Sequence, residues 1–175
     1  MTEHQRYDVV SEFPGFELRR YEPHVLARVR VVGTFERAGS DGFRPLVSYL
    51  GGRNERDQKI AMTAPVIQES PVGSSSHDVS FVMPADSSLE ALPQPSDASV
   101  TLEPHGVEWA AAARFSGRWT EQSVLEHART LADRVSAAGL TITGPVRFAR
   151  FDPPWTPWFL RHHEVVVPVA PPADA

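Results

Sequence analysis

The four residues Thr63-Ala64-Pro65-Val66 recur in altered form as Thr143-Gly144-Pro145-Val146, 80 positions further along the chain. Two other stretches recur in the same order at intervals of 81 and 84 positions: Glu22-Pro23-His24 with Glu103-Pro104-His105, and Val82-Met83-Pro84 with Val166-Val167-Pro168. Short matches that keep their order and spacing indicate an internal duplication. The sequence therefore predicts two similar halves that pack around one core.

Each half shows the same succession of patterns: strand, helix, strand, strand. Runs in which β-branched or aromatic residues alternate with polar ones predict strands at residues 16–32, 59–68, 79–83, 107–115, 146–151 and 164–169. One helix is predicted over 121–138, with Thr120 as its N-cap and Gly139 just past its end. A shorter helix is predicted over 43–50, capped by Asp41, with Pro45 in or beside its first turn. These patterns indicate an α+β fold with mostly antiparallel strands.

The remaining segments are predicted to be irregular. Residues 69–78 and 84–99 are rich in Gly, Ser and Pro, which favour loops. A length of 175 residues suits one domain, so we expect a single domain over 1–169 and a flexible tail over 170–175.

Composition excludes several classes of protein. The chain has no cysteine, so disulfides, thiolate metal sites and covalently attached heme are excluded. The formal net charge is −5 and the basic residues are dispersed, so a nucleic-acid partner is not expected. We find no apolar run long enough to span a membrane and no secretory signal, which together predict a soluble cytoplasmic protein. Common nucleotide-binding and hydrolase motifs are also missing, so no enzymatic activity is expected.

Several motifs together resemble the SOUL heme-binding family in order and spacing. They are Gly33-Thr34-Phe35, Gly42-Phe43, Tyr49-Leu50-Gly51-Gly52-Arg53-Asn54, Lys59-Ile60-Ala61-Met62-Thr63-Ala64-Pro65-Val66, Phe81-Val82-Met83-Pro84, Phe115-Ser116-Gly117 and Asp152-Pro153-Pro154-Trp155-Thr156-Pro157. The resemblance covers residues 7–169. It implies a distorted antiparallel β-barrel with two flanking helices, built from two pseudo-symmetric halves. It also implies reversible, non-covalent binding of heme b or another tetrapyrrole by an intracellular heme carrier or buffer, with a heme donor or acceptor protein as partner.

One departure from the family concerns two histidines. Where the family usually has Arg-Arg-Asn-Glu, this chain has Arg161-His162-His163-Glu164. If the strand at 163–167 is equivalent to that at 79–83, His163 points toward apolar surroundings and His162 points the other way with Glu164. His163 is then either an iron ligand or a hydrogen-bonded histidine in the place of the family's asparagine. His162 is either a second heme contact or a solvated partner of Glu164, and a zinc site on His162 and Glu164 is a further alternative.

The other candidate heme contacts are Met62, Arg161, Trp155 and Phe159. Trp155 and Phe159 belong to an aromatic cluster with Phe151 and Trp158, which would either line a porphyrin slot or form a lid or part of the core. Met62 lies in the resemblance's most specific block and either packs or binds iron. Arg161 is a candidate for the heme propionates, as are Arg19, Arg20 and Arg150, and the alternative for each arginine is ordinary solvated surface. His24 and His105 occupy matching places in the repeats and are expected to serve the scaffold.

A second functional class has the same duplicated architecture. Bacterial effector-binding modules of the gyrase-inhibitor-like type bind amphipathic ligands in a groove between their halves. Competition between bulky organic cations and hemin would distinguish this alternative from heme binding.

Overall fold

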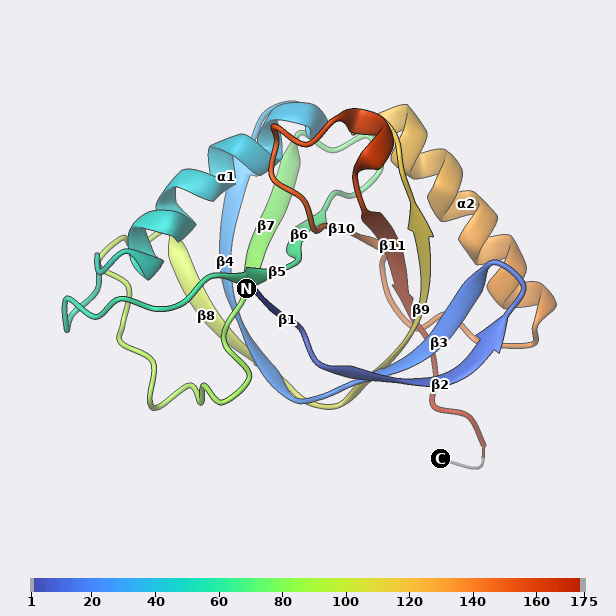
Figure 1. Ribbon diagram of the computed structural model, residues 1–175, viewed down its shortest axis with the longest axis horizontal. Helices are drawn as coiled ribbons and strands as arrows, with labels where there is room; N and C mark the ends of the chain where they lie inside the picture. Colours follow the sequence, from blue (N-terminus) through green and yellow to red (C-terminus); the bar gives the residue numbers. More distant parts are fainter. Residues whose placement is uncertain (1, 174–175) are drawn as a thin grey trace. The chain divides into compact units, whose positions relative to one another are not determined.

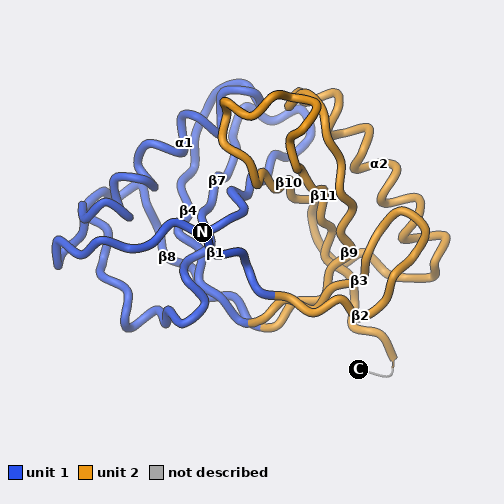
Figure 2. Tube along the Cα trace, viewed as in Figure 1, with its two compact units in different colours: residues 1–6, 23–106 blue, residues 7–22, 107–175 orange. Residues whose placement is uncertain are grey.

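The computed structural model describes residues 2–173, and the chain divides into two compact units (Figure 2). Unit 1 consists of residues 1–6 and 23–106, and unit 2 consists of residues 7–22 and 107–175. Each unit therefore holds one of the two halves indicated by the repeats, together with a short N-terminal segment.

Unit 1 is an antiparallel sheet covered by one helix (Figure 1). Its strands β4 (His24–Val32), β6 (Val66–Glu69), β7 (Ser76–Val82) and β8 (Val100–His105) pair in the order β6-β7-β4-β8. Helix α1 (Phe35–Leu50) packs against β4 and β7. Two short strands, β1 (Glu3–His4) and β5 (Thr63–Ala64), pair in parallel. The core lies between the helix and the sheet, where Leu46 and Tyr49 of α1 meet Val79 and Phe81 of β7.

Helix α1 begins eight residues earlier than the sequence predicts, and its predicted cap, Asp41, is wrong because Thr34 occupies the N-cap position. The buried face follows helical spacing but uses small residues such as Ala38 and Gly42, which contribute little to a hydrophobic pattern. Gly42 is required there, because a Cβ at this position would lie 2.7 Å from the Cβ of Val79. Pro45 was predicted to lie in or beside the first turn of this helix, but it lies inside the helix because α1 begins earlier.

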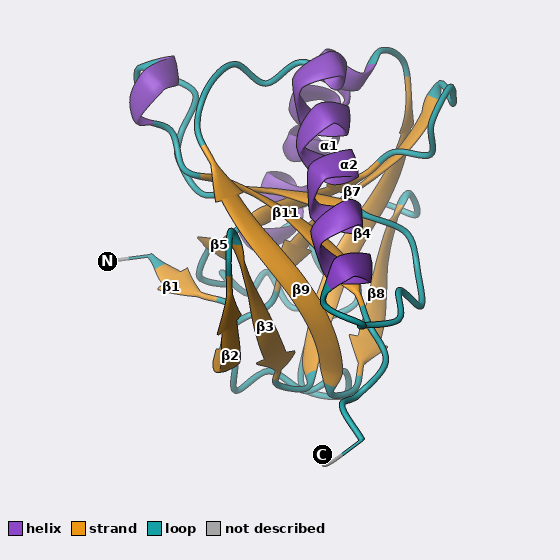
Figure 3. Cartoon of the chain, turned by 90° about the vertical axis from the view of Figure 1, so that its right-hand side faces the viewer, coloured by secondary structure: helices purple, strands orange, loops and turns teal. Residues whose placement is uncertain are grey.

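Unit 2 has the same construction (Figure 3). Its strands are β2 (Tyr7–Phe13), β3 (Phe16–Tyr21), β9 (Glu108–Phe115), β10 (Arg147–Arg150) and β11 (His163–Pro168), paired antiparallel in the order β2-β3-β9-β11-β10. Helix α2 (Glu121–Ala137) packs on β9 and β11. Its prediction is confirmed, including the cap, since the Thr120 side chain accepts a hydrogen bond from the Ser123 N–H at 3.2 Å. A short 3-10 helix, η1 (Trp158–Leu160), lies between β10 and β11.

The predicted duplication is visible in the strand order of each unit. Strands β6, β7 and β4 of unit 1 follow one another across the sheet as β10, β11 and β9 do in unit 2, and in each unit the helix follows β4 or β9 along the chain. The order strand, helix, strand, strand is therefore confirmed for both halves. The α+β class is confirmed as well, but neither sheet closes on itself within its unit, so the predicted barrel is not observed at that level.

Several predicted boundaries are wrong. The strand predicted over 16–32 divides into β3 and β4 at Glu22-Pro23, because proline has no N–H to give to a sheet. Strands β2 and β8 were not predicted, and β2 is exposed along almost its whole length, so it has no buried face to reveal it. His105 ends β8, and its ring stacks on that of His24, its partner in the pairing of β4 with β8, with the ring centres 5.4 Å apart.

Other expectations can be checked against the part of the chain that the structure describes. No helix or strand occurs over 84–99, as predicted, whereas the loop predicted over 69–78 is shortened because β6 and β7 extend into it. The Ala170 N–H still bonds the Thr141 carbonyl at 2.8 Å, and residues 174–175 of the predicted tail lie outside the described residues. The single domain over 1–169 stays a prediction. In residues 2–173, no helix has the length and apolar character needed to cross a membrane.

Candidate functional site

His163 is the first residue of β11 and lies in unit 2, directly opposite Arg150 of β10 and Phe115 of β9. Side chains opposite one another in antiparallel strands project from the same face of a sheet. Helix α2 covers this face, since the His127 ring stacks on Phe115 with the ring centres 4.2 Å apart. The His163 ring lies 5.3 Å from Phe115 and 5.0 Å from Trp119. The predicted apolar orientation of His163 is therefore confirmed.

The imidazole of His163 is buried and lacks a conventional partner. Its side chain is 1% exposed, and neither ring nitrogen makes a hydrogen bond of good geometry with any residue of 2–173. Burial lowers the pKa of His163 to about 4, and the backbone of Gly117 opposes this fall without cancelling it. The ring is therefore neutral at pH 7, and the choice between an iron ligand and a hydrogen-bonded structural histidine stays a prediction.

Arg150, across from His163, is a second polar group without a matching charge. Its guanidinium carbon lies 4.8 Å from the centre of the Trp119 ring. Burial, and to a smaller extent the positive charge of Arg161, lower its pKa to about 10. Among the described residues no carboxylate forms an ion pair with Arg150. One partly buried cation and one neutral imidazole thus share this face of the unit 2 sheet.

Glu164 lies on the opposite face of the same sheet and is fully engaged. Its carboxylate is 3% exposed and accepts two hydrogen bonds from Arg19, at 2.7 and 3.0 Å. His162 Nε2 lies 3.0 Å from the same carboxylate. Burial alone would raise the pKa of Glu164, but the hydrogen bonds from His162 and Arg19 outweigh burial and lower the pKa to about 2. The pairing of His162 with Glu164 is confirmed, although Glu164 is buried and not solvated, and Arg19 is not a surface arginine.

The segment between β10 and β11 presents apolar side chains to solvent. Trp155 is 83% exposed, Trp158 50%, Phe159 59% and Leu160 63%. The alternative that this cluster belongs to the core is therefore wrong for these residues. Monomeric proteins seldom expose such a group of large apolar side chains without a binding function. We call residues 155–160 the aromatic segment.

The aromatic segment is braced by polar contacts to its backbone. Arg161 donates to the carbonyl of Thr156 at 2.8 Å and to that of Pro154 at 2.7 Å. The Gly117 N–H donates to the Trp158 carbonyl at 3.2 Å, and Arg118 lies 5.6 Å from the Trp158 ring. Arg161 therefore holds the segment in shape, and Arg118 is the cation nearest to its exposed rings among these contacts.

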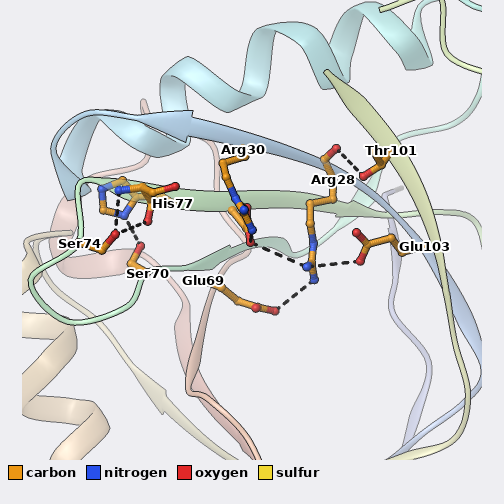
Figure 4. A network of polar contacts seen from close by, with 10 residues as sticks. Arg28, Arg30, Glu69, Ser70, Ser74, His77, Thr101 and Glu103 are labelled. Atoms are coloured by element: carbon orange, nitrogen blue, oxygen red, sulfur yellow. Dashed lines mark hydrogen bonds and ion pairs between the residues drawn. The ribbon is translucent and has the colours of Figure 1, made fainter. Parts of the chain in front are cut away.

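Met62 lies in unit 1 and is 42% exposed, and both roles considered for it, packing and iron binding, stay predictions. The polar network of unit 1 lies elsewhere, on the sheet face away from α1 (Figure 4). There Arg28 reaches Glu103 at 3.3 Å and Glu69 at 3.6 Å. Figure 4 also shows His77, whose ring nitrogens contact Ser70 at 2.7 Å and the Gly33 carbonyl. These contacts within unit 1 indicate a structural role.

Five of the six candidate heme contacts predicted from the sequence lie in one segment of unit 2, at residues 155–163. The groups that surround His163 were not among them. Trp119 was not considered, and Arg150 was treated as one arginine among four. The signal that could have found Arg150 is its position five residues after Pro145, in a strand whose register is set by β11. The zinc alternative lacks ligands, because no group of three His, Cys, Asp or Glu side chains in residues 2–173 could hold a metal ion.

The described residues fit a flat, amphipathic ligand that carries a metal. A tetrapyrrole needs apolar contacts for its ring, cations for its carboxylates and, optionally, one imidazole for its iron. The aromatic segment would supply the apolar contacts, and Arg118 and Arg150 are the nearby cations for the carboxylates. His163 would supply the imidazole for the iron.

Comparison with solved structures shows what fold this arrangement belongs to. The C-terminal domain of EcmrR matches with a TM-score of 0.68 over 94% of this chain and 98% of that domain, at 13% sequence identity. A hydrolase from Listeria innocua matches with a TM-score of 0.63 over 92% of this chain and 94% of that protein, at 10% identity. Similarity at such low identity concerns the fold alone.

Sequence comparison identifies the family. Heme-binding protein 2 of Mus musculus is 29% identical over 138 residues, which are 75% of this chain and 67% of that protein. The human protein of the same name is 30% identical over 68% of this chain and 61% of its own length, and heme-binding protein 1 of Xenopus laevis is 25% identical over 85% of both chains. The family model for the SOUL heme-binding proteins matches residues 2–168. This chain belongs to the SOUL heme-binding protein family.

Proposed function

We propose that this protein binds heme b reversibly and without a covalent bond, through the aromatic segment of unit 2. The observation that carries the proposal is the exposure of Trp155, Trp158, Phe159 and Leu160, which lie directly before His163 in the chain. Covering these side chains with a porphyrin ring removes apolar surface from water at about 25 cal/mol per Å². Family membership and the names of the curated relatives support heme as the ligand.

His163 is the proposed iron ligand. Heme supplies an iron that can accept a neutral imidazole nitrogen, and the low pKa of His163 keeps its ring neutral over the whole physiological range. Because the ring is 1% exposed, ligation requires that the groups covering it move aside. We therefore expect hemin to dock on the aromatic segment first and to be ligated afterwards. His162 is held by Glu164 and is the weaker candidate.

The wider role is proposed from the same features. The exposed aromatic segment and the buried His163 ring favour reversible binding of heme over chemistry on it. We therefore propose a cytoplasmic heme carrier or buffer that exchanges heme with a donor or acceptor protein. No catalytic activity is proposed. The closed barrel and the single domain implied by the family stay predictions.

The experiment is a hemin titration followed by Soret absorbance. Wild-type protein is compared with the double variant Trp155→Ala/Trp158→Ala and with Val72→Ala, a control on an apolar side chain of unit 1 that is 77% exposed. We expect at least a tenfold loss of affinity in the double variant and none in the control. Equal binding by all three proteins would place the ligand elsewhere. A normal affinity in His163→Leu, with an altered Soret position, would separate docking from ligation.

The effector-binding alternative has less support from the geometry. A buried carboxylate without a cation beside it would favour bulky cations, and Glu164, the one buried carboxylate among residues 2–173, is instead neutralised by Arg19 and His162. Competition between hemin and tetraphenylphosphonium tests it, because only an effector site of this kind would bind the cation as tightly as hemin.

A further inference from the structure

Arg150 and His163 leave one requirement of the unit 2 core unmet. Arg150 lies against the Trp119 ring in a partly buried position, and among the described residues no carboxylate forms an ion pair with it. A desolvated cation without an anion is costly, and proteins normally provide a carboxylate for it. Asp152, two residues further along the chain, accepts the His162 backbone N–H and forms no ion pair with Arg150.

His163, the neighbour of Arg150 across the strand pair, lacks a well-placed acceptor for its ring N–H. The His163 ring, directly across the strand pair, is buried with both nitrogens unpaired, and a neutral imidazole still has one N–H to donate. A donor of this kind and a guanidinium on the same sheet face converge on the same type of ligand group, an anion with two oxygens.

We infer that Arg150 and His163 form a binding site for a carboxylate, which in this protein is a propionate of the bound tetrapyrrole. The guanidinium lies on the face of Trp119 and presents its N–H groups to one carboxylate, and the His163 N–H donates to the same group. The inference rests on the proposed tetrapyrrole binding and names the chemistry that orients the ligand. In this arrangement His163 is not the iron ligand, so the two roles proposed for its ring are alternatives that the experiments below separate.

The site should be visible in stability as well as in binding. A structural arginine stabilises the fold, so its loss is destabilising. A ligand-binding cation that lacks a protein partner does the reverse, because the unbound protein bears the cost of holding it. We therefore expect Arg150→Gln to be at least as resistant to urea as the wild type. A clear loss of stability in Arg150→Gln would indicate a structural role and contradict the inference.

The binding test uses iron-free protoporphyrin IX and its dimethyl ester, which lacks both carboxylates. We expect the wild type to bind the diacid about tenfold more tightly than the ester, Arg150→Gln to lose this preference, and Arg129→Gln, on the exposed surface of α2, to keep it. Full preference in Arg150→Gln would overturn the inference.

A separate arm removes the porphyrin altogether. Sodium propionate is titrated while the ring signals of His163 are followed by NMR, and we expect a saturable shift in the wild type that is absent from Arg150→Gln. If the wild type binds neither porphyrin but shows this shift, the proposed function fails and the carboxylate site stands, as a site for free carboxylates. If the wild type shows no saturable shift and no preference for the diacid, the carboxylate site is refuted.

Discussion

Replacing His163 with leucine should stabilise the protein, and by more at low pH than at neutral pH. At pH 7.5 the wild-type ring is neutral and buried, and it makes no hydrogen bond of good geometry, so a leucine of similar volume removes the cost of a poorly satisfied polar group. That cost is about 1–3 kcal/mol. The variant should therefore gain an amount of this order in its free energy of unfolding.

The gain should grow as the pH falls from 6.5 toward 4. In this window the imidazole of the unfolded chain binds a proton, whereas the folded ring does not until its pKa of about 4. Proton uptake by the unfolded state favours unfolding, so the wild type loses stability as the pH falls. The separation between 6.5 and about 4 corresponds to about 3 kcal/mol. His163→Leu lacks this group. Between pH 6.5 and 4 its free energy of unfolding should therefore fall by about 3 kcal/mol less than that of the wild type.

Urea denaturation of both proteins at pH 7.5, 6.0 and 4.5 measures the difference. Other titrating groups, Glu164 among them, are common to the two proteins and largely cancel. If the two unfolding free energies run parallel from pH 7.5 to 4.5, His163 is not held neutral by burial. If the variant is the less stable protein at pH 7.5, the ring has a stabilising partner, and both the iron-ligand and the carboxylate proposals lose their basis.

Three further changes test the fold that positions the site. Glu164→Gln should cost about 3–5 kcal/mol at pH 7 because it leaves Arg19 buried without its anion; the wild type should lose the same contribution as the pH falls from about 4.5 to about 2, since this carboxyl has a lowered pKa in the fold. Gly42→Ala should cost about 1–3 kcal/mol by forcing α1 away from Val79, and an unchanged urea midpoint would contradict the close packing. Thr120→Ala should cost about 1 kcal/mol through loss of the α2 cap, measured in the same way.

Local signals explain which parts of the fold could be predicted. Helix α2 has large apolar residues at helical spacing, such as Val124 and Leu131, and a capping threonine, so its existence and its start were readable. In helix α1, three of the seven buried residues are alanine or glycine, which add little to a hydrophobic pattern. The start of α1 could therefore not be predicted. Strand β2 has no buried face, so no periodicity of apolar residues can reveal it.

The site was predictable in its location but not in its chemistry. The alternation of β11 correctly separated His163 from Glu164, because a strand's two faces follow directly from sequence position. The partners of these residues depend on other strands: Arg19 reaches Glu164 from β3, and Arg150 faces His163 from β10. The aromatic segment was partly misjudged because hydrophobic residues are usually buried, and only the structure shows that Trp155 and its neighbours are exposed.

The central claim, that a tetrapyrrole binds to unit 2 at the segment before His163, is tested most directly by NMR mapping with a diamagnetic heme analogue, gallium protoporphyrin IX. The account predicts that the amide signals of residues 151–163 and of Gly117 to Trp119 shift on titration, while those of α1 and of the Arg28 network in unit 1 stay unchanged. Shifts confined to unit 1, or no saturable shift anywhere, would contradict the account.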